Sequence, residues 1–588
     1  MKKIFGFLGA MALCVFAGCS NEDLTGSGNN QGQPSKGDLH MTLNISQASV
    51  MGTRTSTPDQ GVEQGKDAEN KISKALLIVA DANSKIVSVV NIVPGASGKA
   101  EIVTSTDGTT HTAKFQLDRQ VLQEKVTAAN GSYEFKLFMI ANPTDDIVKL
   151  YTETKKAGAD VQDVFTLAAE DKENKFWSPN NFLMSSADWT KKTITDDDIK
   201  EGMHTTADNP LNLGTIKVQR DMSRFDLATD DQYTIFNTNN GNTELGNLVV
   251  SFDGVALINM ATTANMFKEV GNTPEDKAMF VEETVNNYVF SPDQTTWRHA
   301  MYSVSNAAIQ TGTCLTFDNG NLTYTSISDL KDNDDDNEYT HPGTTKPSNV
   351  PDYKIWRYCM PNTNYDKANQ KHGNTTGIVF RAEITGSFQY WVKETNPAYS
   401  EETKTEQPEF IYKSASKNIS ELDANTVLYA YNNTIYGDLE GLTCFVEGGE
   451  PEDEAELYEY TKVKLAYENA MAGITTDDND AKEKALVANG FTIYRPDKSG
   501  KYMCYYIYWN RHNDNNNPGL MGPTEFATVR NNVYKLSVNK ITRLGRPVNP
   551  NDDPEPDEPG TDDENDKLWG DVVCRILPWE VRVNGIEF

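Results

Sequence analysis

The first residue of this sequence with an evident chemical role is Cys19, which ends an N-terminal segment typical of exported bacterial proteins. Two lysines precede an apolar run, and the run closes on Phe16-Ala17-Gly18-Cys19. Small residues before a cysteine suit bacterial lipoprotein processing, in which the cysteine is acylated and becomes the first residue. We therefore predict that residues 1–19 are a signal peptide and that Cys19 carries a lipid. No later segment has the length and apolar character of a membrane span, so this lipid would be the membrane attachment.

Arg54 is the second residue whose type and position suggest chemistry. It is the first arginine of the chain, the next being Arg119, and it lies in a loop of small and polar residues, SQASVMGTRTSTPDQG. An arginine-specific protease that cut between Arg54 and Thr55 would release everything up to Arg54 and nothing else. The alternative is an ordinary surface arginine, and the loop alone leaves both open.

No catalytic or metal-binding pattern stands out elsewhere. The histidines are scattered, no GxSxG elbow is present, and Gly95–Lys99 lacks the spacing of a phosphate loop. The acidic run Lys331–Glu338 lacks the glycine of an EF-hand loop, and no cysteine pair has CxxC spacing. We expect no catalytic residue, no metal, no cofactor and no enzyme activity. A glycosidase could still be hidden, because its two carboxylates need no local motif. One disulfide of undetermined pairing also stays open.

Length and composition favour a large extracellular β protein. The chain has 588 residues, enough for several domains, and its net charge of -31 makes nucleic acid a poor partner. Short apolar stretches separated by Gly, Asn and Asp predict an all-β fold of sandwich type rather than a parallel α/β sheet. Some helix is expected only within Thr144–Lys172, and a domain break is expected near residue 220.

The segment Asp38–Ser46, which precedes Arg54, predicts a half-buried strand. Apolar and polar residues alternate along it with the period of a strand that is covered on one face. The apolar face consists of Leu39, Met41, Leu43 and Ile45.

The last apolar segment, Val572–Val583, predicts another strand, and it follows the acidic, proline-rich spacer Asn549–Asp566. Such a spacer cannot fold alone. The strand is apolar on both faces for half its length, so it needs cover on both sides. It either folds back onto its own domain or is made for another molecule, and we favour the second reading. Its main apolar face would consist of Val573, Leu577, Trp579, Val581 and Val583.

A resemblance connects these features. The segment Leu520–Pro547, with its core EFATVRNNVYKLSV and its Gly-Arg-Pro exit, resembles the fimbrillins of the FimA/Mfa type. The acidic spacer, the terminal Leu577-Pro578-Trp579 and the cysteine at the end of the signal fit the same family. These proteins are shaft subunits of protease-assembled type V pili, and the likeness is nearest to the major subunit of short (Mfa) fimbriae.

The resemblance implies two tandem transthyretin-like β-sandwich domains and a C-terminal donor strand. The corresponding ranges are a propeptide at 20–54, domains at 55–220 and 221–546, and the spacer with donor strand at 547–588. It also implies an outer-membrane lipoprotein precursor that an arginine-specific protease cuts after Arg54. Loss of the first strand would open a groove for the C-terminal strand of another subunit.

The implied partners are identical or related subunits, anchor and tip subunits, the protease, and host or bacterial surface receptors, in a cell-surface fimbrium. Two alternatives stay open. One is an anchor or tip subunit of the same pilus, and the other is a monomeric surface lipoprotein that binds glycans.

Overall fold

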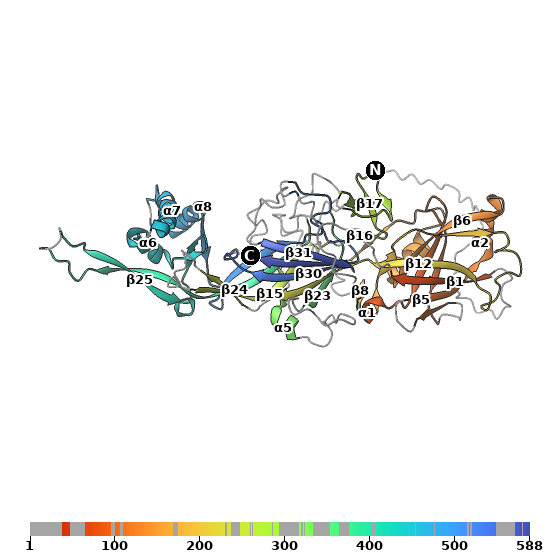
Figure 1. Ribbon diagram of the computed structural model, residues 1–588, viewed down its shortest axis with the longest axis horizontal. Helices are drawn as coiled ribbons and strands as arrows, with labels where there is room; N and C mark the ends of the chain where they lie inside the picture. Colours follow the sequence, from red (N-terminus) through yellow and green to blue (C-terminus); the bar gives the residue numbers. More distant parts are fainter. Residues whose placement is uncertain are drawn as a thin grey trace, which may run out of the picture. The chain divides into compact units, whose positions relative to one another are not determined.

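The computed structural model describes residues 38–47, 65–292, 317–332, 353–547 and 571–587, with shorter gaps within these ranges. Strands dominate this part of the chain and helices are few, so the predicted all-β class is confirmed (Figure 1). The chain divides into two compact units. The first comprises residues 1–46, 72–161 and 189–216, and the second comprises 47–71, 162–188 and 217–588. Along the chain, the last change from the first unit to the second falls between Ile216 and Lys217. The predicted domain ranges 55–220 and 221–546 remain a prediction.

The first unit is built on one antiparallel sheet. In one part of the sheet the strand order is β3-β2-β6, with β11 also paired to β6, and in another part it is β12-β1-β5-β4. The six residues of β2, ALLIVA, are all buried, because a continuous apolar run needs cover on both faces. The strands are β1 (Asp38–Gln47), β2 (Ala75–Ala80), β3 (Ile86–Ile92), β4 (Glu101–Thr104), β5 (Thr110–Asp118), β6 (Ser132–Ala141), β11 (Thr190–Thr195) and β12 (Leu211–Arg220), whose end belongs to the second unit.

Helices in the first unit are short. Helix α2 (Arg119–Ala128) begins directly after β5, where the Asp118 carboxylate accepts a hydrogen bond from the Gln120 N–H at 2.9 Å. Helix α3 (Asp145–Lys149) continues into the π-helical turn Leu150–Thr154 and ends there. The helix expected within Thr144–Lys172 is therefore shorter than predicted, since β7 (Val164–Thr166) is a strand.

The second unit contains a β-sandwich. One sheet has the order β23-β13-β30-β32-β31, and the other has β14-β15-β24-β25, with β29 and β22 paired to its inner strands. A single apolar core draws Phe225 and Tyr534 from the first sheet and Phe252, Phe380 and Tyr506 from the second. The strands are β13 (Ser223–Thr229), β14 (Gln232–Phe236), β15 (Asn247–Ile258), β22 (Thr325–Ser326), β23 (Lys354–Cys359), β24 (Gly377–Thr395), β25 (Phe410–Asn418), β29 (Tyr502–Trp509), β30 (Asn532–Lys540), β31 (Asp571–Pro578) and β32 (Glu580–Glu587).

An insertion between β25 and β29 carries most of the helix in the described chain. It contains β26 (Leu428–Tyr431), β27 (Thr434–Ile435), β28 (Phe491–Tyr494), α6 (Leu439–Gly448), α7 (Glu454–Met471) and α8 (Asn479–Ala488). The three helices gather beside the β24–β25 ribbon (Figure 1). They share a core with β26 and β28 that includes Leu442, Val463 and Leu486. The sequence analysis did not predict these helices.

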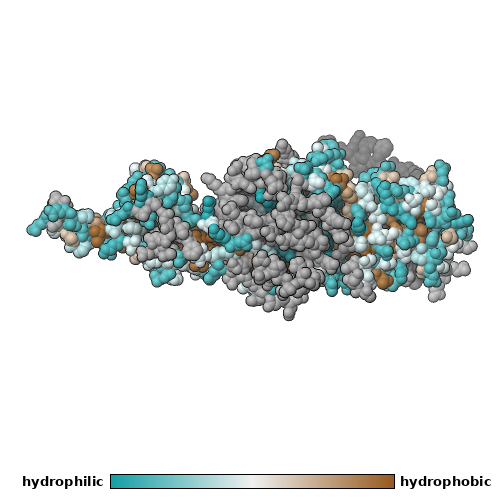
Figure 2. All heavy atoms as spheres, in the orientation of Figure 1, coloured by the Kyte–Doolittle hydropathy of each residue, from teal (hydrophilic) through white to brown (hydrophobic). Residues whose placement is uncertain are grey.

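Short elements complete the second unit. Where its surface is coloured in Figure 2, polar residues predominate and apolar residues are scattered among them. Tyr458 of α7 and Phe410 of β25 are large exposed aromatic residues, and they come from different elements. The short elements are α1 (Asp67–Asn70), β8 (Trp177–Ser178), β9 (Asn181–Phe182), β10 (Met184–Ser186), β16 (Thr263–Asn265), β17 (Glu269–Gly271), β18 (Ala278–Met279), β19 (Tyr288–Val289), β20 (Phe317–Asp318), β21 (Asn321–Leu322) and α5 (Ile327–Asp332).

Candidate functional site

Strand β1 lies inside the sheet of the first unit rather than at its edge. It pairs antiparallel with β5 from Asp38↔Asp118 to Ser46↔Thr110, and β12 is its neighbour on the other side. Its inward side chains, Leu39, Met41, Leu43 and Ile45, are 0%, 1%, 0% and 0% exposed. Burying four such side chains contributes on the order of 6–12 kcal/mol, at about 1.5–3 kcal/mol each, before the cost of ordering the strand.

The other face of β1 is polar and half-exposed, and it makes a few specific contacts. The Thr112 hydroxyl donates to the side-chain oxygen of Asn44 at 3.0 Å. The side-chain amide of Gln116 lies 3.1 Å from a ring nitrogen of His40. The backbone N–H of His40 donates to the backbone carbonyl of His204 at 2.7 Å. The strand is therefore held mainly by its apolar face and its backbone ladder.

The C-terminal segment corrects one prediction. The single strand expected over Val572–Val583 is two strands, β31 and β32, which pair antiparallel from Asp571↔Glu587 to Ile576↔Arg582. Pro578 lies where the first strand ends, and a proline cannot donate to a ladder. Val573 and Leu577 thus belong to β31, whereas Val581 and Val583 belong to β32.

The position of this hairpin also differs from the expectation that the segment stands apart from its own domain. Strand β32 runs parallel to β30 from Asn532↔Glu580 to Lys540↔Glu587, and β31 forms the edge of the sheet. The physical reason is that a segment with apolar residues on both faces is stabilised inside a folded domain, and the sheet of the second unit provides the strand beside it. The predicted positions Cys19, Arg54, Thr55 and Trp579 lie outside the described residues.

Helix α1, the first element after the Arg54 loop, is fixed in the second unit by buried charges. Glu69 is 1% exposed, and Arg224 donates to both of its carboxylate oxygens at 3.1 and 3.2 Å. The Tyr358 hydroxyl also donates to this carboxylate. Arg224, itself fully buried, donates to both oxygens of Asp226 at 2.8 Å. We call Glu69, Arg224, Asp226 and Tyr358 the α1 clasp.

The backbone of α1 is held as well. The Lys66 N–H donates to Glu69 at 2.7 Å, and Arg220 donates to the Glu69 carbonyl at 3.2 Å. Burial acts to raise the pKa of Glu69, but Arg224, Arg220 and the hydrogen bonds of Tyr358 and Lys66 outweigh it and hold that pKa below its ordinary value. The carboxylate is therefore ionised at neutral pH and keeps α1 in place.

The segment that carries the sequence resemblance forms the centre of the second unit. Every residue from Thr524 to Val538 is buried. Arg530 donates to Asp221 at 2.6 Å and to the Met266 carbonyl at 3.0 Å, and Ser185 donates to the same Asp221 oxygen at 2.6 Å. The second oxygen of Asp221 is buried without a hydrogen-bond partner, and burial raises the pKa of this carboxyl to about 7.

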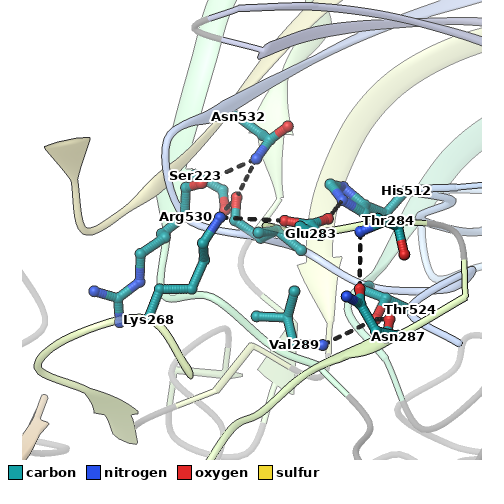
Figure 3. Close-up of polar contacts among 12 residues, drawn as sticks. Ser223, Lys268, Glu283, Thr284, Asn287, Val289, His512, Thr524, Arg530 and Asn532 are labelled. Atoms are coloured by element: carbon teal, nitrogen blue, oxygen red, sulfur yellow. Dashed lines mark hydrogen bonds and ion pairs between the residues drawn. The ribbon is translucent and has the colours of Figure 1, made fainter. Parts of the chain in front are cut away.

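A second buried group joins residues 268–292 to the same segment. The side chains of Glu283 and His512 point toward each other and form a hydrogen bond (Figure 3). The other ring nitrogen of His512 lies 2.9 Å from the Tyr534 hydroxyl, which also accepts the Val529 N–H at 2.9 Å. Glu283 and His512 are 4% and 1% exposed, so the group is closed to substrates and serves to hold segments together.

The described residues contain no group of three His, Cys, Asp or Glu side chains placed to hold a metal ion. Within the same ranges no helix is long and apolar enough to cross a membrane. The cysteines described with their side chains, Cys359, Cys444 and Cys504, are buried and not disulfide-bonded. Sequence reasoning missed the α1 clasp and the Glu283–His512 pair, since their partners are far apart in the chain and follow no period.

Comparisons with known proteins agree with this picture of the C-terminal part. Residues 500–585, which include β29, β30, β31 and most of β32, match the family model for the major fimbrial subunit protein type IV, fimbrillin, C-terminal. No curated protein matches the chain.

Solved structures give distant likenesses. A proposed cell adhesion protein from Parabacteroides distasonis has 12% identity and a TM-score of 0.28, with 64% of this chain and 80% of that chain covered. One from Bacteroides eggerthii has 10% identity and a TM-score of 0.28, with 66% and 97% covered. A fimbrial assembly protein from Parabacteroides distasonis has 10% identity and a TM-score of 0.23, with 59% and 95% covered. Over residues 500–585, this chain is therefore similar to the C-terminal region of the fimbrillin family of fimbrial subunits.

Proposed function

We propose that the chain is a structural shaft subunit of a bacterial surface fimbria and that it polymerises by exchanging strands between copies. The observation that carries the proposal is the position of β1. An interior strand with four buried apolar side chains is the first element of the described chain, and Arg54 follows it in the sequence. One cut at Arg54 would break the covalent link between β1 and everything after it.

The proposed sequence of events begins with export as a lipoprotein acylated at Cys19. An arginine-specific protease then cuts between Arg54 and Thr55 at the outer membrane. A strand of another subunit then replaces β1 between β12 and β5, and backbone hydrogen bonds join it to these two strands. The final location is a cell-surface fimbrium, with anchor and tip subunits at its ends and surface receptors as its adhesion targets.

The C-terminal segment is the proposed donor because its side chains match what the β1 position needs. That position accepts four apolar side chains at alternate residues. Leu577, Trp579, Val581 and Val583 repeat this pattern once the segment is extended into one strand. Donation requires β32 to leave β30, so the hairpin would have one place in the monomer and another in the polymer. In the acceptor four apolar anchors would replace four, and in the donor new contacts must also offset the lost pairing of β32 with β30.

The alternatives make different demands on the same features. An anchor subunit would keep its lipid and have no use for a cut at Arg54, and a tip subunit would not need to donate a C-terminal strand. A monomeric glycan-binding lipoprotein would present a platform of exposed aromatic side chains. Phe410 on β25, Tyr458 on α7 and Trp189 just before β11 are exposed but come from separate parts of the chain, so we do not favour that reading.

The test is to compare wild-type protein with Arg54→Lys in cells that assemble fimbriae. The lysine variant keeps the charge and denies the protease its arginine. We expect wild-type fimbrial protein to begin at Thr55 without lipid, and Arg54→Lys to remain a lipidated, unpolymerised precursor. N-terminal sequencing, mass spectrometry and electron microscopy read out the three properties. Fimbriae built from acylated Cys19 chains would overturn the proposal.

A further inference from the structure

We infer that cutting the chain after β1 does not release β1, and that the strand stays bound to its unit until another strand displaces it. The inference rests on the proposed function and concerns how that function is controlled. The cut would make the subunit competent for exchange without producing an empty groove.

The contacts of β1 carry the inference. All of its paired residues, Asp38 to Ser46, precede Arg54, so the ladder with β5 is the same before and after the cut. The strand is interior, with β12 on its second side, and it cannot peel away from an open edge. Its four inward side chains are at most 1% exposed. Burying these four side chains contributes on the order of 6–12 kcal/mol before the cost of ordering the strand, and hydrogen bonds to strands on both sides add to this.

The new end created by the cut does not loosen β1 either. The chain after the cut is fixed separately, because the α1 clasp holds residues 66–70 within the second unit through Glu69, Arg224 and Tyr358. Cleavage therefore removes only the covalent connection through the loop. Both sides of the cut keep their own contacts.

This retention has a consequence for location. The N-terminal fragment produced by the cut would run from the acylated Cys19 of the proposed precursor to Arg54, so it would carry both the lipid and β1. A cut subunit would remain attached to the membrane through a non-covalent strand. It would leave the membrane only when a donor strand replaces β1, and this couples release to incorporation into the polymer.

The experiment uses full-length precursor in detergent, cut within residues 48–64 and then analysed by size-exclusion chromatography with mass spectrometry. One sample is cut by an arginine-specific protease, and a second carries an inserted site for an unrelated protease, so retention is measured whether or not Arg54 is the natural site. We expect the fragment to co-elute with the body of the protein. A fragment that elutes alone directly after either cut would overturn the inference.

Two additions sharpen the result. A synthetic peptide of residues 571–588 should release the fragment, and Met41→Ala or Leu43→Ala should speed its release about tenfold or more. Thr42→Ala, on the half-exposed face of the same strand, is the matched control and should leave the rate unchanged. A retained fragment that the peptide fails to displace supports retention and counts against the C-terminal hairpin as donor. Equal release from the Leu43 and Thr42 variants would contradict the account of what holds β1.

Discussion

The α1 clasp gives a quantitative prediction about how helix α1 is held in the second unit. Glu69→Gln keeps the size of the side chain but removes the charge that Arg224 meets at 3.1 and 3.2 Å. Removing one partner of a buried ion pair typically costs about 3–5 kcal/mol, because the other charge stays buried. Arg224 keeps Asp226 at 2.8 Å, so we expect a loss of about 3 kcal/mol in the unfolding free energy of the second unit.

The pH dependence of this loss is a stricter test than its size. The pKa of Glu69 is lowered in the folded protein, so its contribution is present above the ordinary value of 4.5 and is lost as the pH falls through the folded pKa. The difference between wild type and Glu69→Gln should therefore be largest near pH 7 and shrink below about pH 4.5.

The assay is urea unfolding at several pH values, combined with hydrogen exchange of the peptide that spans residues 65–71. Glu394→Gln is the matched control, because Glu394 pairs with Lys413 at 2.7 Å on the surface of the same unit and such pairs contribute about 0–1 kcal/mol. A loss below about 1 kcal/mol for Glu69→Gln, or one that does not change with pH, would refute the reasoning.

Three further predictions concern other parts of the chain. Because burial raises the pKa of Asp221 to about 7, the stability contributed by its protonated form should be lost as the pH rises from about 4 to 7, and Asp221→Asn should flatten that fall in urea unfolding. Trp579→Ala should weaken polymer joints by about 2–4 kcal/mol, seen as a lower temperature at which polymers in detergent collapse to monomer, and an unchanged temperature would exclude Trp579 as an anchor. Gly386→Ala should lower the melting temperature because its Cβ would lie 2.1 Å from the Asn247 carbonyl oxygen, whereas Gly214→Ala, also at positive φ but with nothing within 4 Å, should cost much less.

The strands that sequence reasoning places well are those with a simple period. Leu39 to Ile45 alternate over seven residues, and the structure buries every second side chain of this run. Alternation over one segment fixes a strand because it needs no information from elsewhere in the chain.

Sequence reasoning missed features that depend on residues far apart in the chain, and it also missed the helices of the second unit. The alternation of apolar residues carries no information on where a chain reverses. The segment predicted as one strand is therefore the hairpin of β31 and β32. The buried face of α7 consists of Tyr460, Val463, Ala466 and Ala470, whose spacing of three to four residues is helical, so this helix did carry a local signal that the sequence analysis did not use. Glu69 meets Arg224 and Tyr358 across 155 and 289 residues, and no local pattern predicts a contact of that range.

The parallel pairing of β13 with β30 has a mechanical meaning for a fimbria under tension. The two strands run side by side from Arg224↔Val533 to Thr229↔Val538. In a polymer, force from one neighbour would enter β13 at its first residue, through β12, and leave at the last residue of β30, toward the C-terminal spacer. Parallel strands pulled from opposite ends slide along each other in shear, and all six residue pairs must part together rather than open one by one. Once the C-terminal hairpin has left β30 in the proposed polymer, β13 is the remaining neighbour of β30 in this sheet, so the load between successive joints would pass through this pair.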